Sequence, residues 1–168
     1  MNNEDCFNVV EIPDKRTLFV ACDGMGGHSC GEVASQTVCD SFSTYWEEHP
    51  EQEDSKAKVL DAVKEASRIL DEKSGYYQMG TILVMCSIEG KRATIAHAGD
   101  SRCYVIDIKG NVKYRTIDHI ESSSISLVIL RMKLPLNSIW EAFFIFADRK
   151  WLLGALSKHI LIEFRVDS

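Results

Sequence analysis

Acidic residues in two short stretches near the start of the chain have the types and spacing needed to hold a divalent cation. Glu4 and Asp5 precede one apolar stretch, and Asp23 and Gly24 end the next one. Hard cations such as Mg²⁺ and Mn²⁺ prefer oxygen ligands, and a glycine after an aspartate lets the backbone approach the ion. An Asp-Gly pair alone is common in ordinary strand-to-helix turns, so the metal hypothesis depends on its neighbours.

The apolar stretches beside these acids have the pattern of two neighbouring strands. Residues 6–12 and 17–22 are rich in apolar and β-branched residues, and a Pro-Asp-Lys turn separates them. If the strands form an antiparallel hairpin, the start of the first lies beside the end of the second, so Glu4 and Asp5 come next to Asp23. Clustered carboxylates repel one another unless a cation neutralises them. We therefore expect a carboxylate cluster that binds metal, with a solvated acidic segment as the alternative.

The rest of the chain alternates helical and strand patterns in a way that predicts helices packed on a sheet. A capping box at Ser29 and Glu32 predicts the start of a first helix. Its apolar face is predicted to contain Val33, Ala34, Val38, Phe42 and Tyr45. Further predicted elements are a helix at 55–73, an antiparallel meander of strands at 81–88, 93–98, 103–108 and 112–116, a buried strand at 142–147 and a final helix at 151–164. Residues 121–137 show no clean period.

Composition and charge narrow the function classes. The chain has 168 residues, of which 45% are hydrophobic, so we expect one domain over residues 1–168. A formal net charge of -6 gives no electrostatic footprint for a polyanion, so nucleic-acid binding is not expected. No apolar run reaches membrane-spanning length and no signal peptide is present, so we expect a cytoplasmic protein that does not bind membranes. The six cysteines form no CxxC pair and are predicted to be reduced.

Several motifs together resemble one known family. They are NED at 3–5, VACDGMGGHSCGEVAS at 20–35, MGTILV at 79–84, AHAGDSRCYVI at 96–106 and TIDH at 116–119. Their order and spacing resemble the metal-dependent protein serine/threonine phosphatases, the PPM or type 2C family, in its bacterial style. The resemblance covers residues 3–119, and it extends more loosely over 142–151, where AFFIFADRKW is similar to the family's strand ending in Ser-Asp-Gly. It implies an α+β fold of two packed antiparallel β-sheets flanked by helices, shortened at the C-terminal side.

The resemblance also implies a site for two Mg²⁺ or Mn²⁺ ions at one end of this sandwich. The two ions would activate a water molecule for in-line attack on a phosphoserine or phosphothreonine of a protein substrate, without a covalent enzyme intermediate. The metal ligands that it implies are Glu4, Asp23 as the bridging ligand, the Gly24 carbonyl, Asp118 and Asp148. The same resemblance makes Asp5 and Asp23 the catalytic residues, with Asp5 bonded to metal-bound water and Asp100 supporting the site from behind.

The sequence departs from the family pattern at positions that matter for catalysis. Members of the family have a phosphate-binding arginine before the Glu-Asp pair and a final Asp-Asn metal ligand, and neither motif is found in this sequence. Arg149 stands where the family has a glycine after the later metal-binding aspartate. These departures indicate a truncated or divergent copy. The alternative function is therefore a catalytically impaired relative that binds phosphoproteins as a regulatory module.

Aromatic residues late in the chain allow a further hypothesis about assembly. Trp140, Phe143, Phe144 and Trp151 would form either part of the core or an exposed apolar patch. Such a patch attracts another chain, so we consider a homo-oligomer that covers it.

Overall fold

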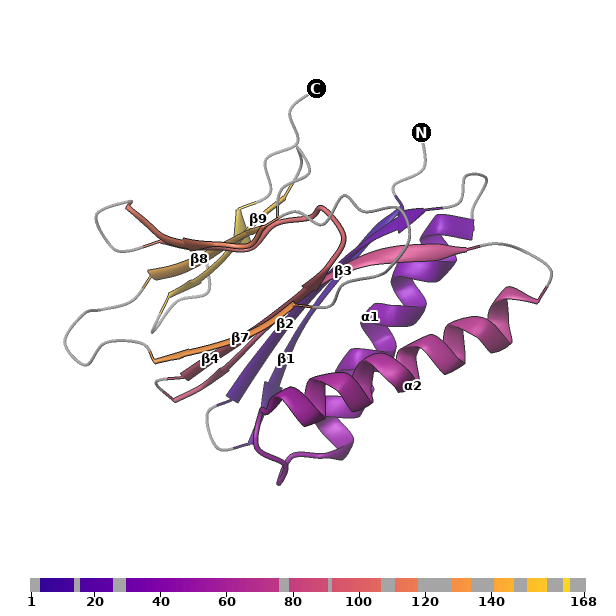
Figure 1. Ribbon diagram of the computed structural model, residues 1–168, viewed down its shortest axis with the longest axis horizontal. Coiled ribbons are helices and arrows are strands. Elements are labelled where there is room, and N and C mark those ends of the chain that lie inside the picture. Colours follow the sequence, from indigo (N-terminus) through magenta and orange to yellow (C-terminus); the bar gives the residue numbers. More distant parts are fainter. Residues whose placement is uncertain are drawn as a thin grey trace.

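The computed structural model describes residues 4–13, 16–25, 30–75, 79–90, 92–106, 111–117, 128–133, 141–146, 151–156 and 162–163. Its elements are β1 (Asp5–Ile12), β2 (Arg16–Met25), α1 (Cys30–Glu48), α2 (Lys56–Ser74), β3 (Gly80–Glu89), β4 (Arg92–Ala98), β5 (Tyr104–Ile106), β6 (Val112–Arg115), β7 (Val128–Lys133), β8 (Glu141–Phe146), β9 (Trp151–Leu156) and β10 (Ile162–Glu163). Both helices lie on one side of the main sheet, and β8 and β9 lie on the other (Figure 1). The predicted α+β class with antiparallel sheets is confirmed.

The main sheet has the strand order β1-β2-β3-β4-β7, and all neighbouring strands are antiparallel. Strand β2 is buried on both faces, because Leu18 and Val20 belong to the core under the helices whereas Phe19 belongs to the core on the opposite side. A strand that is covered on both faces is apolar along its length, which explains the run at residues 18–22. The β3–β4 turn contains Gly90 at φ 57°, a conformation that favours glycine.

Helix α1 covers the sheet with the apolar stripe that the sequence predicts, apart from one residue. Ala34, Val38 and Phe42 are buried against β1, β2 and β3, and Trp46 continues the same stripe. Val33 is 44% exposed, so its place on the buried face was predicted wrongly. One step along an α-helix turns the side chain by about 100°, which carries Val33 away from the sheet when Ala34 faces it. The capping residue Ser29 lies outside the described residues.

Helix α2 packs on α1 and begins and ends where the sequence indicates. Ser55 is its N-cap, and the Lys58 backbone N–H donates to the Ser55 hydroxyl at 3.3 Å. Gly75 ends it at φ 55°, where a residue with a side chain would be strained. Val59, Ala62 and Ala66 are buried in the core shared with α1. Among the described helices, none combines the length and the apolar character needed to cross a membrane.

Of the predicted four-stranded meander, the pairing of the first strand with the second and of the third with the fourth is correct, but the four strands do not form one sheet. Strand β3 pairs with β4 and β5 pairs with β6, but the second pair forms a sheet of its own, and β4 instead pairs with β7. Gly99, at φ 107°, begins the turn after β4. This turn carries the chain to the opposite side of the sheet, where Cys103 and Val105 pack over Phe19. The edge of β4 is thereby left for β7, within the 121–137 stretch that showed no period.

The predicted final helix at 151–164 is wrong, because the described residues there form strands. Strand β9 pairs antiparallel with β8 on one side and with the short β10 on the other. In the β8–β9 pair, Phe146 is opposite Trp151. A short link between two apolar stretches favours a hairpin. Gly154 lies in the middle of the stretch, and glycine disfavours a helix by about 1 kcal/mol relative to alanine.

A buried ionic cluster attaches the loop between the two helices to the sheet. The Asp54 side chain is 1% exposed and accepts hydrogen bonds from Trp46 Nε1 at 3.1 Å and Lys58 Nζ at 3.3 Å. Ser87 of β3 also donates to it, and Arg16 of β2 lies 3.8 Å away. Burial lowers the pKa of Lys58, and the charge of Asp54 opposes that shift. The carboxylate therefore compensates two buried cations.

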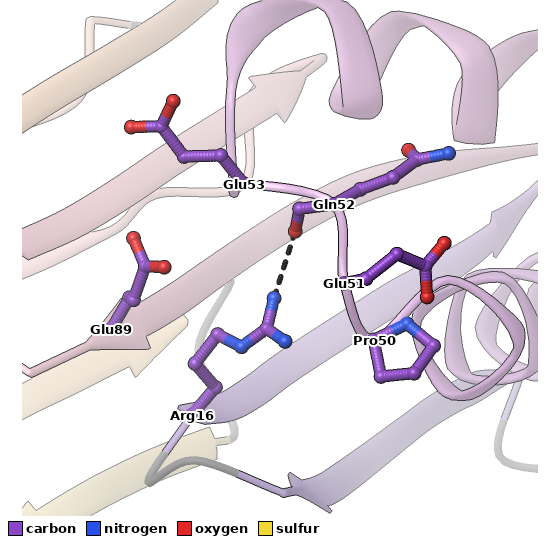
Figure 2. A pocket seen from close by; sticks show the side chains of 6 residues that line it. All are labelled: Arg16, Pro50, Glu51, Gln52, Glu53 and Glu89. Atoms are coloured by element: carbon purple, nitrogen blue, oxygen red, sulfur yellow. Dashed lines mark hydrogen bonds between the residues drawn. The ribbon is translucent and has the colours of Figure 1, made fainter.

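This cluster lies under an open cavity at the end of the sheet where β2 begins. The cavity has a volume of about 230 Å³ and is lined by Arg16, Pro50, Glu51, Gln52, Glu53 and Glu89. Figure 2 shows the Arg16 guanidinium directed at the backbone of Gln52, and the two groups bond at 2.8 Å. Two of these lining residues, Glu53 and Glu89, each form an ion pair with Arg92, at 3.3 and 2.9 Å.

We predict that Asp54→Asn destabilises the fold strongly. The substitution leaves the buried charges of Lys58 and Arg16 without their carboxylate, a loss that typically costs about 3–5 kcal/mol. Urea unfolding should show this decrease in the free energy of unfolding. Asp61→Asn is the matched control, because the ion pair between Asp61 and Lys64 has 54% and 75% exposed side chains and such pairs contribute about 1 kcal/mol or less. Equal stabilities of the two variants would contradict the structural role of Asp54.

Candidate metal centre

The β1–β2 hairpin places the residues that carry the predicted carboxylates side by side. In its register the Cα atom of Asp5 lies opposite that of Asp23. The Gly24 N–H donates to the Glu4 carbonyl at 3.0 Å, which extends the pairing by one residue. The expected proximity of Glu4 and Asp5 to Asp23 is therefore confirmed. One detail differs, since β2 continues through Asp23 to Met25 instead of ending at residue 22.

The first turn of α1 closes the site from the helix side. A Cβ atom on Gly31 would lie 2.8 Å from the carboxyl carbon of Glu4 and 3.0 Å from the carbonyl carbon of Gly24. A Cβ atom on Gly24 would in turn collide with the Gly31 carbonyl and lie 2.7 Å from the Glu4 carbonyl. Neither glycine has a positive φ, so both are required by close packing. The Glu4 carboxylate and the Gly24 peptide thus meet against the same point of the helix.

Two hydroxyl groups fix the backbone that carries the acids. Ser35, one turn further along α1, donates to the Glu4 carbonyl at 2.6 Å, and its oxygen also lies 3.1 Å from the Glu32 carbonyl. Thr81 of β3 donates to the Asp23 carbonyl at 2.8 Å. The positions of Glu4 and Asp23 are therefore set by neighbouring elements as well as by the hairpin.

Gly31, Ser35 and Thr81 were not singled out from the sequence. All three lie inside the motifs that resemble the phosphatase family, so the signal that could have found them was present. Small and hydroxyl-bearing residues directly around an acidic turn are the types that allow close backbone contact and support it by hydrogen bonds.

The donor set suits a hard divalent cation in its chemistry. Glu4, Asp5 and Asp23 are partly buried and offer carboxylate oxygens, and Gly24 offers a backbone carbonyl. Mg²⁺ takes about six oxygen ligands and usually keeps several waters, so a few protein ligands suffice. Among the described residues, no three His, Cys, Asp or Glu side chains converge closely enough to hold a metal ion by themselves. The predicted ligands Asp118 and Asp148 lie outside the described residues, as does Arg149.

Asp100 lies at the same end of the sheet as these acids. In the register, Ala98 is opposite Leu83 and Leu83 is opposite Cys22. The turn that follows Ala98 therefore begins at the level of Asp23 in the sheet. A Cβ atom on Gly99 would lie 2.7 Å from the Ile82 side chain, which shows how closely this turn approaches β3. Asp100 itself is exposed. Its predicted supporting role stays a prediction.

Comparison with known proteins gives this arrangement a family context. The serine/threonine phosphatase stp of Listeria innocua is 34% identical over 112 residues, which are 62% of this chain and 44% of that protein. The protein phosphatase PhpP of Streptococcus pneumoniae is 31% identical over 110 residues, 62% of this chain and 45% of that protein. The chain spans about half the length of the curated relatives that it matches.

Solved structures show the same fold. A mutant bacterial serine phosphatase superposes with a TM-score of 0.69 at 28% identity, covering 91% of this chain and 69% of that one. The catalytic domain of the phosphatase PstP in complex with 2 manganese ions gives a TM-score of 0.57 at 24% identity, covering 80% of this chain and 67% of that one. Residues 1–129 match the family described as protein phosphatase 2C. The chain therefore belongs to the protein phosphatase 2C family.

Proposed function

We propose that this chain contributes the metal-binding part of a phosphatase that hydrolyses phosphoserine and phosphothreonine in proteins. The observation that carries the proposal is the hairpin register, which sets Asp5 opposite Asp23 and bonds Gly24 to Glu4. The names of the related proteins, which are serine/threonine phosphatases, support the substrate class.

The proposed ligands of the first ion are the Glu4 and Asp23 carboxylates and the Gly24 carbonyl. All are oxygen donors, which Mg²⁺ and Mn²⁺ prefer over other ligands. When bound, such an ion supplies Lewis acidity, which makes water nucleophilic near neutral pH and offsets charge on the phosphoryl oxygens. Asp118 and Asp148 are the proposed ligands of further ions.

The residues of this chain have separate roles in the proposed reaction. Asp5, opposite Asp23, accepts a hydrogen bond from the attacking water and orients it toward phosphorus. Ser35 and Thr81 hold the backbone of Glu4 and Asp23, so these acids need little rearrangement when substrate binds. No covalent bond between enzyme and phosphate is needed.

A catalytically impaired relative is the second candidate function. The arginine at position 149, where the family has a glycine, is the observation that favours it. In that case the chain binds phosphoprotein partners without turnover. The cytoplasmic location and the homo-oligomer stay predictions under either function.

We predict that Asp23→Asn abolishes metal-dependent turnover, because the amide removes the charge that attracts the cation. Hydrolysis of para-nitrophenyl phosphate with Mn²⁺ should fall by about 100-fold or more, while circular dichroism stays unchanged. Asp71→Asn is the matched control, since Asp71 is an exposed acid on α2. Unchanged turnover in Asp23→Asn would remove this residue from the mechanism, and absent turnover in the parent chain would favour the impaired relative.

We also predict that Gly31→Ala weakens Mn²⁺ binding, because the new methyl group displaces the Glu4 carboxylate. Isothermal titration calorimetry should show an increase in Kd of about tenfold, as is typical when a ligand's support is disturbed. Gly80→Ala is the control: a Cβ atom there would lie 3.7 Å from the Met25 Cε, an ordinary contact. The role of Gly31 fails if both variants bind Mn²⁺ as the parent does.

A further inference from the structure

Met25 is an exposed apolar residue directly beside the candidate metal centre. It follows Gly24 as the last residue of β2, and it is 51% exposed. Within the part of the chain that the structure describes, the other exposed large hydrophobic residues are Val33, Val112 and Ile117. Ile117 directly precedes Asp118, another proposed ligand. Two of these exposed apolar residues are therefore next to proposed metal ligands in the chain.

Strand β2 places Met25 on the same face of the sheet as two of the acids. Side chains alternate between the two faces along a strand. Phe19 packs in the core on the side away from the helices, so Asp23 and Met25, further along the same strand, face that side as well. Asp5 is opposite Asp23 and shares this face. Met25 therefore lies two positions beyond Asp23, about 7 Å along the strand.

The residue opposite Met25 leaves room beside it. Strand β3 pairs with β2 as far as Met25, whose partner in the register is Gly80. A Cβ atom on Gly80 would lie 3.7 Å from the Met25 Cε, so the methyl group lies beside a residue that has no side chain to cover it. The next residue of β3, Thr81, donates to the Asp23 carbonyl and fixes this end of the strand pair close to the acids.

The chemistry of Met25 suits contact with an apolar side chain. Its thioether is a weak hydrogen-bond acceptor, and its flexible, polarizable side chain adapts to partners of different shape. Consecutive Cα atoms of a peptide are about 3.8 Å apart, so residues one or two positions from a phosphoserine lie within about 8 Å of it. This reach matches the separation of about 7 Å between Asp23 and Met25.

We propose that Met25 is a specificity-determining residue that contacts an apolar side chain next to the phosphorylated residue of the substrate. The inference rests on the proposed function, which places the phosphate at the Asp23 end of the hairpin. The acids and their metal bind the phosphoryl group, which every phosphoprotein substrate has, so they do not distinguish one sequence from another. Met25 distinguishes them, because it removes apolar surface from water together with one flanking side chain.

The test compares two phosphoserine peptides that differ only at the two positions on each side of the phosphoserine. One peptide has leucine at these positions and the other has asparagine, which is similar in size but polar. Turnover with Mn²⁺ gives kcat/KM for each peptide. We expect the parent chain to prefer the leucine peptide by about tenfold, the lower end of the discrimination that apolar contacts provide.

Matched variants assign this preference to Met25. Met25→Gln keeps the length of the side chain and replaces the thioether with an amide, so the ratio of the two kcat/KM values should fall to about one. Met25→Leu should retain the preference. Val112→Ser is the control, because Val112 is 55% exposed but belongs to β6, in the two-stranded sheet, and its loss should leave the ratio of the parent chain unchanged.

A binding measurement separates this inference from the proposed function. The same peptides, with a non-hydrolysable phosphonate in place of the phosphate, are added with Mg²⁺ to the chain labelled with ¹³C in its methionine methyl groups. The leucine peptide should bind more tightly and shift the Met25 methyl signal in the NMR spectrum. The signal of Met85, which is 0% exposed, should not move.

The outcomes distinguish the two claims. Turnover of both peptides without a preference, or with a preference that survives in Met25→Gln, would overturn the inference and leave the proposed function in place. A Met25-dependent preference in binding without turnover would support the contact and favour the impaired relative. Neither binding nor turnover of either peptide would overturn both claims.

Discussion

The backbones of β2 and α1 touch at Gly24 and Gly31, and the candidate centre depends on that contact. A Cβ atom on Gly24 would collide with the Gly31 carbonyl. A Cβ atom on Gly31 would crowd the Glu4 carboxylate. Because no side chain separates strand from helix at this point, the Glu4 carboxylate and the Gly24 peptide both lie against the first turn of α1. Ser35 and Thr81 hold the backbone of the two acids, because their hydroxyl groups donate hydrogen bonds to the carbonyl groups of Glu4 and Asp23.

The opposite end of the sheet contains the other concentration of charge, and it has a different character. There Asp54 is 1% exposed and compensates Lys58 and Arg16, so opposite charges are paired inside the protein. At the candidate centre the predicted ligands Glu4, Asp5 and Asp23 are acidic and only partly buried. Paired buried charges hold a structure in place, whereas like charges close together need a cation to relieve their repulsion. The charges at the start of β2 therefore serve stability, whereas for the residues at its other end we propose metal binding.

Local sequence patterns were sufficient to predict the hairpin and its acidic end. Alternation and a turn determine which residues face each other, and Asp5 and Asp23 follow from that register. Long-range contacts were not predictable in this way. Gly31 and Thr81 matter only because α1 and β3 lie against the hairpin, and the place of β7 beside β4 depends on the chain leaving the sheet at Gly99.

Strand β9 was mistaken for a helix because its apolar residues suit either structure when considered alone. The neighbouring β8 decides between them, since Phe146 and Trp151 pair at the start of the hairpin. The acids at 118 and 148 were predicted from resemblance alone, and they lie outside the described residues.

The most direct test of the metal centre is paramagnetic broadening by Mn²⁺ in an amide NMR spectrum of the metal-free chain. Bound Mn²⁺ should broaden the signals of Glu4, Asp5, Gly24 and Gly31 first. Glu51 and Glu53 line the open cavity at the other end of the sheet, and their signals should stay sharp at the same Mn²⁺ concentration. Broadening at the cavity without broadening at the hairpin, or no selective broadening at all, would contradict a metal centre built on the Asp5–Asp23 register.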